Sequence, residues 1–179
     1  LVVDDHTDEV VLKIQRPNIR DTVERDIELL YLLARAIERS IPEARIYSPV
    51  GLVTEFDRAI SDELDFTREA DHAERFSRAF AGDPHVKFPR VYRELTRKKV
   101  LVMELLAGLH VSDALAAGYS GERMAKRLLH ALFKQIYEDG FFHGDPHPGN
   151  IMILGTPEEP VIGFLDLGLV GRMSPEMRD

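Results

Sequence analysis

The sequence contains no cysteine, which excludes disulfide bonds and thiolate metal sites. It also has no long hydrophobic run: residues 100–109 contain Glu104 and fall well short of the roughly 20 residues that span a bilayer. An excess of positive charge is missing too, because the formal net charge is −8, whereas an electrostatic nucleic-acid binder normally presents a basic face. We therefore predict neither a transmembrane helix nor a nucleic-acid partner.

We expect no secretion signal in the first residues of this sequence, since Leu1 is soon followed by Asp4, Asp5, Asp8 and Glu9. Because the first residue is not methionine, we expect a fragment of a longer protein, and we expect this fragment to be soluble. With 179 residues, the chain can bury one substantial core or two small lobes that share a cleft.

Residues 143–150 read His-Gly-Asp-Pro-His-Pro-Gly-Asn, and residues 166–168 read Asp-Leu-Gly. This spacing of aspartate, asparagine and a second aspartate is typical of a phosphoryl-transfer site that holds magnesium and ATP. Magnesium is a hard ion that prefers oxygen ligands, and it neutralises charge on phosphate oxygens. Asn150 and Asp166 fit as magnesium ligands, and Asp145 fits as the residue that orients or deprotonates the attacking hydroxyl group or water.

Hydrophobic patterning predicts an α+β domain. Helical spacing is found over 19–39, 49–80, 112–117 and 121–139, and the inward face of the last helix would comprise Leu128, Leu132, Phe133 and Ile136. Strands are predicted at 10–15, 88–92, 99–105, 151–154 and 161–165, with one hairpin joining the second to the third and another joining the last two. Ser174 reads as the N-cap of a further helix. We expect an N-lobe over 1–103 and a C-lobe over 104–179, with a cleft.

Lys13 lies inside the first predicted strand. The surrounding Val-Leu-Lys-Ile is close to the kinase strand whose lysine contacts the α- and β-phosphates of ATP, although a lysine on the solvent face of a strand is also common. A phosphate-binding lysine needs a carboxylate to position it, and the candidates are Glu63, Asp65 and Glu69. Asp65 and Glu69 would lie one turn apart on a helix. The three acids are equally compatible with a solvated helix face.

Residues 100–108 match a strand that runs into a hinge between two lobes. In kinases, main-chain groups of this hinge bond to adenine, so Met103 would border the adenine pocket, and Glu104 and Leu106 would offer backbone groups. As a plain buried strand, the same segment needs no ligand.

His143 and His147 flank Asp145, which raises zinc as an alternative metal. A zinc site needs a third protein ligand and a defined geometry. The phosphoryl-transfer spacing explains more of the sequence, so we interpret His143 as a residue that braces the loop through hydrogen bonds.

Four blocks resemble the UbiB/AarF family of atypical kinases, and they occur in the same order over nearly the entire chain. The blocks are residues 13–17, 63–70, 141–150 and 166–170. The long stretch between Lys13 and Glu69 also resembles the helical insert of that family. The resemblance implies a protein-kinase-like two-lobed fold with a helical insert in the N-lobe, truncated at both ends.

The family resemblance also implies roles for individual residues. Lys13 would pair with Glu69, Asp145 would be the catalytic-loop aspartate, and Asn150 and Asp166 would bind Mg²⁺. Glu63 and Asp65 would form a Glu-x-Asp motif that faces an N-terminal helical extension, which this sequence does not contain.

The implied activity is that of an ATP-dependent kinase or ATPase that supports quinone or isoprenoid lipid biosynthesis. The implied cofactors are ATP and Mg²⁺. Membrane lipids, quinone precursors or quinone-biosynthesis proteins would be its partners. The full-length protein would lie on the cytoplasmic side, as a peripheral or anchored membrane protein.

Two other functions stay open. A small-molecule phosphotransferase of the aminoglycoside or choline kinase type shares the His-Gly-Asp-x-His-x-Gly-Asn pattern, although the long helical insert argues against it. A nucleotide-binding pseudokinase that acts as a scaffold is the other, although every candidate catalytic residue is present. Gly144 stands where protein kinases have arginine, so we expect no switch by activation-loop phosphorylation.

Overall fold

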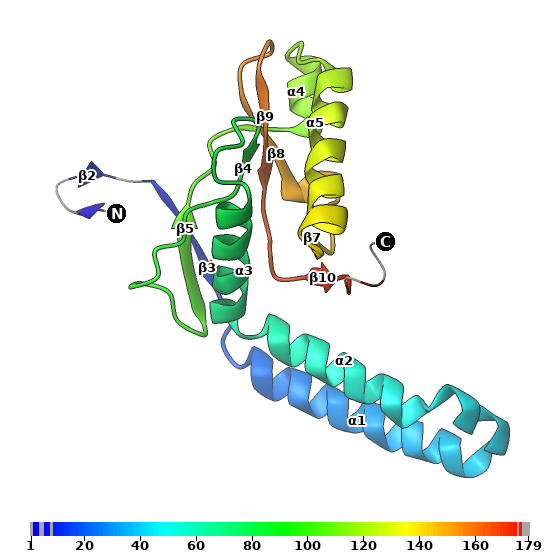
Figure 1. The fold of residues 1–179 in the computed structure, drawn as a ribbon. Helices are drawn as coiled ribbons and strands as arrows, with labels where there is room; N and C mark the ends of the chain where they lie inside the picture. The colour runs from blue at the N-terminus through cyan, green and yellow to red at the C-terminus, as the bar shows by residue number, and fades with distance from the viewer. Residues whose placement is uncertain (1, 4–5, 8, 175, 177–179) are drawn as a thin grey trace. The chain divides into compact units, whose positions relative to one another are not determined.

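The computed structural model describes residues 2–3, 6–7, 9–174 and 176. The chain forms two compact units, one of residues Leu1–Lys13 with Phe66–Asp179 and one of residues Ile14–Asp65. Helices and sheets are both present, so the predicted α+β class is confirmed (Figure 1).

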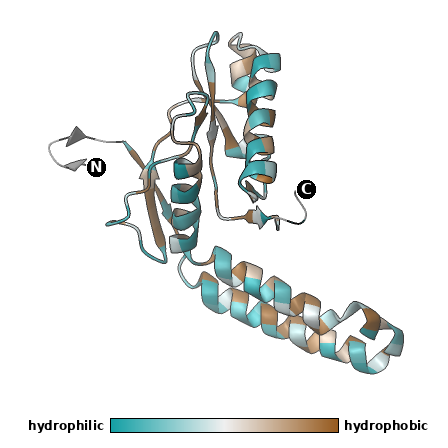
Figure 2. Cartoon of the chain, viewed as in Figure 1, coloured by the Kyte–Doolittle hydropathy of each residue, from teal (hydrophilic) through white to brown (hydrophobic). Residues whose placement is uncertain are grey.

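The unit of residues Ile14–Asp65 is a helical hairpin. It contains α1 (Ile19–Ser40), the 3₁₀ helix η1 (Pro42–Tyr47) and α2 (Pro49–Glu63), and α1 packs along α2. Within the hydrophobic stripe of α1, Ile27 and Ala34 are buried, at 6% and 4% exposure. Hydrophobic residues, brown in Figure 2, occur along both helices of the hairpin. Many large side chains of this unit are exposed: Leu29, Leu32, Leu33, Ile46, Tyr47 and Leu52.

The prediction of one long helix over 49–80 was wrong. The structure has α2, which ends at Glu63, and a separate α3 (Phe66–Ala79). Two tertiary hydrogen bonds interrupt the helical ladder: the Gln15 side chain donates to the Leu64 carbonyl at 3.0 Å, and the Phe66 N–H donates to the Lys98 carbonyl at 3.1 Å. Neither partner is close in sequence, so local periodicity could not reveal the break.

The first strands of the other unit are short. β1 (Val2–Val3) pairs antiparallel with β2 (His6–Thr7), and β3 (Val10–Ile14) pairs with β5 (Val100–Glu104). The predicted hairpin between 88–92 and 99–105 is only partly present, because isolated bridges join Val91 to Met103 and Arg97 to Val100. Pro89 has no amide hydrogen for a ladder, and the strand nearby is the short β4 (Val86–Lys87).

A four-stranded sheet orders its strands β4-β9-β8-β6. Its members besides β4 are β6 (Leu109–His110), β8 (Ile151–Gly155) and β9 (Pro160–Phe164). The predicted hairpin of β8 and β9 is confirmed, with register from Ile151↔Phe164 to Gly155↔Pro160. A separate pair joins β7 (Phe141–His143) to β10 (Val170–Arg172).

Helices α4 (Val111–Ala116) and α5 (Gly121–Phe133) pack against this sheet (Figure 1). A π-helical turn, η2 (Lys134–Glu138), continues α5, and the 3₁₀ turn η3 (Pro148–Asn150) precedes β8. The aromatic core is continuous, since Phe88 stacks on Phe76 at 5.0 Å and on Phe164 at 5.1 Å between ring centroids.

The predicted inward face of the last helix was partly wrong. Phe133 is 56% exposed, whereas Met124, Ala131 and Gln135 are buried. These three residues and Leu128 form one row at helical spacing. Because Gln135 is polar, hydrophobic spacing alone did not identify this row as the buried face.

The helix predicted to begin at Ser174 falls largely on residues 175 and 177–179, which lie outside the described residues. Within the described ranges, no helix combines the length and hydrophobicity that crossing a bilayer requires.

Candidate functional site

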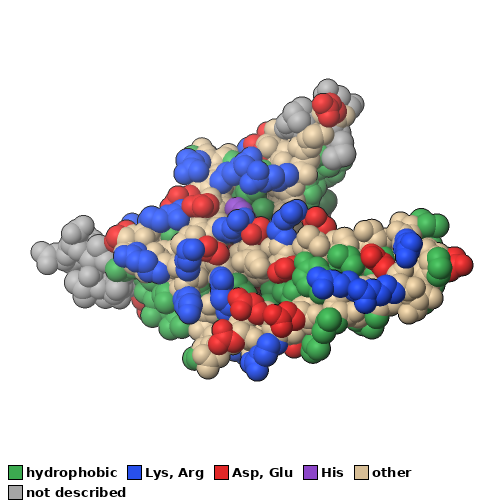
Figure 3. All heavy atoms as spheres, turned by 90° about the horizontal axis from the view of Figure 1, so that it is seen from below, with side chains coloured by type: hydrophobic (Ala, Val, Ile, Leu, Met, Phe, Trp, Pro, Cys, Tyr) green, Lys and Arg blue, Asp and Glu red, His purple; other side chains and the backbone are tan. Residues whose placement is uncertain are grey.

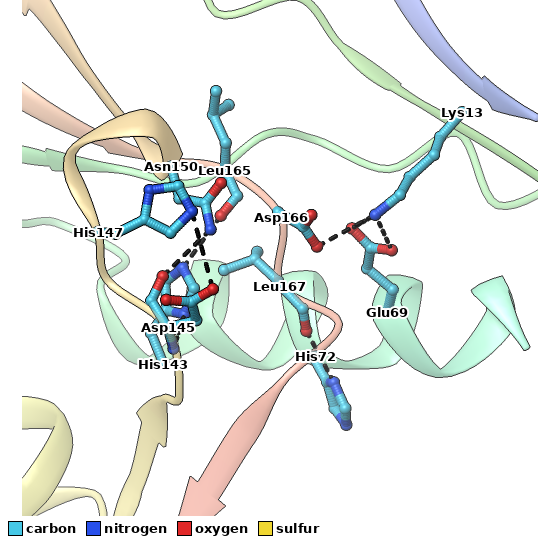
Figure 4. Close-up of polar contacts among 10 residues, drawn as sticks. All are labelled: Lys13, Glu69, His72, His143, Asp145, His147, Asn150, Leu165, Asp166 and Leu167. Atoms are coloured by element: carbon cyan, nitrogen blue, oxygen red, sulfur yellow. Dashed lines mark hydrogen bonds and ion pairs between the residues drawn. The ribbon is translucent and has the colours of Figure 1, made fainter. Parts of the chain in front are cut away.

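Lys13 lies at the centre of a three-residue ion cluster (Figure 4). Its Nζ donates to Glu69 Oε2 at 2.8 Å and Oε1 at 3.1 Å, and to Asp166 Oδ1 at 3.1 Å. The three side chains come from β3, from α3 and from the loop after β9. Residues far apart in the sequence thus meet as predicted for a phosphate-binding lysine and its carboxylate.

The strand β3 presents its polar face to the interior of its unit. Leu12 and Ile14 are 55% and 65% exposed, and Lys13 between them points at Glu69, which is only 5% exposed. Alternation along a strand therefore holds, but the apolar face is the one in solvent. The interpretation of Lys13 as an ordinary solvent-facing lysine is excluded.

The charges of the cluster depend on one another. Burial alone would lower the pKa of Lys13, but the carboxylates of Glu69 and Asp166 outweigh it and raise that pKa above 10.5. Burial raises the pKa of Glu69, and the Lys13 ammonium works against this rise. Since one ammonium faces two carboxylates, Lys13 is held in its charged form.

The loop that carries Asp145 is fixed by hydrogen bonds of its own residues. The Asn150 side-chain nitrogen donates to the Asp145 carbonyl at 3.1 Å, and the Gly149 N–H donates to His147 Nδ1 at 3.0 Å. His147 Nε2 lies 3.7 Å from Asp145 Oδ2. The Asp145 side chain is 55% exposed, so its carboxylate can meet a substrate.

Asn150 and Asp166 stand at the open end of the β8–β9 hairpin. The Leu165 N–H donates to the Asn150 carbonyl at 2.8 Å, which continues the ladder by one step. Asp166 has a φ of 48°, in the left-handed region where aspartate is more common than most residues. The side-chain nitrogen Nδ2 of Asn150 is bonded to Asp145, whereas its side-chain oxygen Oδ1 has no bond within the described residues and is left for a ligand. This oxygen and the Asp166 carboxylate form a donor set that fits magnesium.

A cavity of about 460 Å³ adjoins the cluster. Its lining includes Lys13, Glu69, Met103, Glu104, Leu106, Asn150 and Asp166, but not Asp145. A second cavity of about 540 Å³ shares Glu104 and Leu106 with it and contains neither the lysine nor the candidate magnesium ligands. The smaller cavity is therefore the candidate nucleotide site.

The predicted hinge lies along this cavity. The Glu104 N–H donates to the Arg90 carbonyl at 2.8 Å, so of its backbone groups only the carbonyl could serve an adenine base. The Glu104 carboxylate contacts Lys87 and accepts from the Arg90 N–H at 3.1 Å. These contacts anchor the hinge segment; an adenine-binding role for Met103, Glu104 and Leu106 remains a prediction.

Zinc receives no support from the geometry. His143 is 2% exposed and both ring nitrogens are engaged, with Nδ1 accepting from the Asp145 N–H at 3.2 Å and Nε2 bonded to the Leu165 carbonyl at 3.0 Å. Over the residues that the structure describes, no three His, Asp or Glu side chains converge as a metal-binding group.

Glu63 and Asp65 belong to the helical-hairpin unit, whereas Glu69 belongs to the unit of the cluster. Glu63 is the last residue of α2, and Asp65 precedes α3. The predicted alignment of Asp65 with Glu69 on one helix was therefore wrong, because Asp65 lies in the break between α2 and α3, whereas Glu69 lies within α3. A role for the Glu-x-Asp pair remains a prediction.

The sequence reading missed two polar residues near the site. His72 Nδ1 is bonded to the carbonyl of Leu167 at 2.9 Å, inside the Asp-Leu-Gly segment (Figure 4). Gln135 is completely buried, and its Oε1 accepts from the His143 N–H at 2.9 Å. Gln135 lies on the buried row of α5 and η2. A polar residue at helical spacing with buried apolar residues was the sequence feature that could have identified it.

Gly144, which stands where protein kinases have arginine, lies close to Leu169. Its N–H donates to the Leu169 carbonyl at 2.9 Å, and a Cβ at this position would lie 2.8 Å from the Leu169 side chain. A residue with a side chain at this position would therefore have to displace Leu169.

Comparisons with known proteins agree with this geometry. The chain matches the ABC1 atypical kinase-like domain over residues 2–179, so it belongs to that family. It is 40% identical to a protein of Aliivibrio fischeri (strain MJ11) named probable protein kinase UbiB, over 172 residues that cover 94% of this chain and 32% of that protein. A Pseudomonas fluorescens (strain SBW25) protein of the same name is 40% identical over 176 residues, covering 96% and 33%.

A solved structure supports the kinase-like fold. Rv3197 of Mycobacterium tuberculosis, determined in complex with erythromycin, has a TM-score of 0.71 and 26% sequence identity, over 96% of this chain and 41% of that chain. The predicted resemblance to UbiB-type atypical kinases is thus confirmed. The chain spans about a third of the length of the curated relatives.

Proposed function

We propose that this chain is the catalytic segment of a UbiB-type atypical kinase or ATPase that binds Mg-ATP. The observation that carries this proposal is the bonding of Lys13 to both Glu69 and Asp166, beside a cavity that Asn150 also lines. A lysine held by a buried glutamate next to a magnesium-type aspartate is the arrangement that phosphoryl transfer requires.

Each residue has a defined task in this proposal. Lys13, positioned by Glu69, contacts phosphate oxygens of ATP, and backbone groups of the hinge contact the adenine. Asn150 and Asp166 hold magnesium, which when bound neutralises charge on the phosphate oxygens. Asp145, whose carboxylate is exposed, orients the attacking hydroxyl group or water and accepts its proton.

The wider function follows from the family. The activity would support quinone or isoprenoid lipid biosynthesis, with membrane lipids, quinone precursors or quinone-biosynthesis proteins as partners. The full-length protein would act at the cytoplasmic side of a membrane, as a peripheral or anchored protein. The Glu-x-Asp pair, Glu63 and Asp65, would face a segment outside this chain.

Turnover by the full-length protein tests the proposal. ATP hydrolysis is measured with and without magnesium, lipid vesicles and a phenolic quinone-precursor mimic, for the wild type, Asp145→Asn and the control Asp113→Asn. Asp113 is an exposed acid on α4. We expect Asp145→Asn to lose turnover but keep ATP binding, and the control to behave as wild type.

Other outcomes point elsewhere. Phosphate transfer to a small hydroxylated acceptor, without a response to lipid or phenol, would favour a small-molecule phosphotransferase. ATP binding without turnover in the wild type would favour a pseudokinase scaffold. Equal turnover in the wild type and Asp145→Asn would contradict the role of Asp145.

A further inference from the structure

Gln135 occupies an unusual position for a polar residue. It is completely buried and lies in the π-helical turn η2, where the Asp139 N–H donates to the Lys134 carbonyl at 3.0 Å. Wide turns of this kind occur mostly as single bulges and frequently at functional sites. Its Nε2 has no hydrogen-bond partner within the described part of the chain, which is a cost that an apolar side chain would avoid.

The other end of the Gln135 amide explains why a polar residue is useful there. Among the described strands, β7 pairs with β10 alone. On the other side of β7, Gln135 Oε1 accepts from the His143 N–H at 2.9 Å. The backbone from which the His143 ring projects is therefore held on one side by its pairing with Val170 of β10 and on the other by the bond to Gln135.

The His143 ring then connects two loops. Its Nδ1 accepts from the Asp145 N–H at 3.2 Å, which leaves Nε2 to donate its proton to the Leu165 carbonyl at 3.0 Å. Leu165 directly precedes Asp166. The ring of one buried histidine therefore sets the backbone of both the catalytic and the magnesium-binding loops.

We propose that Gln135 is a positioning residue of the phosphoryl-transfer site, which acts through the His143 backbone on the placement of Asp145 and, more weakly, of Asp166. The inference rests on the function proposed above for Asp145 and Asp166. The two loops differ in how far they depend on His143. Asp166 is also bonded to Lys13, and Leu165 to Asn150, so loss of Gln135 displaces Asp145 first.

The test is Gln135→Met in the full-length protein, because methionine keeps the length of the side chain and removes both polar ends. It removes the bond to His143 and the unpartnered nitrogen together, so the two effects on stability oppose each other. We expect kcat for ATP to fall by about 10- to 100-fold, as small misplacements of catalytic groups do, while KM for Mg-ATP changes less than about threefold. The control is Met124→Ala, since Met124 is buried on α5 and lies outside this network.

Amide hydrogen exchange gives a readout that does not need turnover. In the wild type, the His143 amide should be protected like the core, and in Gln135→Met it should exchange faster while amides of α5 stay protected. A rapidly exchanging His143 amide in the wild type would overturn the inference even if the variant fails to fold.

The remaining outcomes separate the two proposals. A Gln135→Met protein with wild-type kcat would refute the positioning role, and so would a loss of kcat matched by Met124→Ala at equal loss of Tm. Absence of turnover in the wild type would refute the proposed function, while the exchange data would still report whether Gln135 holds His143.

Discussion

Replacing Glu69 with glutamine keeps the shape of a buried side chain and removes the charge that faces Lys13. Removing one partner of a fully buried ion pair costs about 3–5 kcal/mol. Lys13 keeps 33% of its side chain exposed and keeps Asp166 as a partner. We therefore expect a smaller loss of about 1–2 kcal/mol, near the lower end of the roughly 1.5–3 kcal/mol of a hydrogen bond to a charged group. In a chain of this size, that loss lowers Tm by roughly 2–8 °C.

Thermal unfolding of Glu69→Gln, Lys13→Met and the double variant measures this interaction. The coupling energy between the two sites should be about 1–2 kcal/mol, since the residues are in contact. Glu74→Gln is the matched control, because Glu74 lies on the same helix and pairs with Arg93 nearer the surface, where an ion pair contributes about 0–1 kcal/mol. Additive effects of the two substitutions, with equal costs at Glu69 and Glu74, would refute the reasoning.

Two further predictions concern stability. Burial lowers the pKa of His72 below 6.5, so the unfolded chain protonates this histidine more readily than the folded chain does, and stability falls as the pH drops below about 6.5. His72→Gln should therefore reduce the fall in Tm between about pH 7.5 and 5. A Tm that depends on pH in the same way in the variant and the wild type would contradict this. Phe164→Ala should lower the free energy of unfolding, measured in urea, by about 3–5 kcal/mol, because Phe164 is fully buried against Phe88. The control is Leu115→Ala, at a side chain that is 50% exposed. Similar losses in the two variants would show that the aromatic stack is not the core.

The sequence was most informative where chemistry and local pattern coincide. Hydrophobic patterning predicted a hairpin between Asn150 and Asp166, and β8 and β9 form it. The pairing of Lys13 with Glu69 was predicted from family resemblance, and the distances of 2.8 and 3.1 Å between Lys13 Nζ and the Glu69 carboxylate oxygens agree with it. The lobe boundary near Met103 stays a prediction.

Tertiary contacts decided the features that the sequence could not show. The break between α2 and α3 depends on the hydrogen bonds from the Gln15 side chain to the Leu64 carbonyl and from the Phe66 N–H to the Lys98 carbonyl. The inward direction of the Lys13 side chain depends on its bond to Glu69 rather than on the apolar residues of its own strand. The network of Gln135 was missed because a lone polar residue interrupts a hydrophobic row. On the face shown in Figure 3, charged side chains of both signs are interspersed. The net charge of the chain therefore could not have indicated a functional surface there.

The central claim is that Asp166, with Asn150, holds magnesium beside a nucleotide bound at Lys13. Isothermal calorimetry of ATP binding to the full-length protein, with and without magnesium, tests it most directly when the wild type is compared with Asp166→Asn and the control Asp113→Asn. We predict binding that magnesium strengthens in the wild type and the control, and that no longer responds to magnesium in Asp166→Asn. An equal response to magnesium in all three proteins, or no ATP binding by the wild type, would contradict the claim.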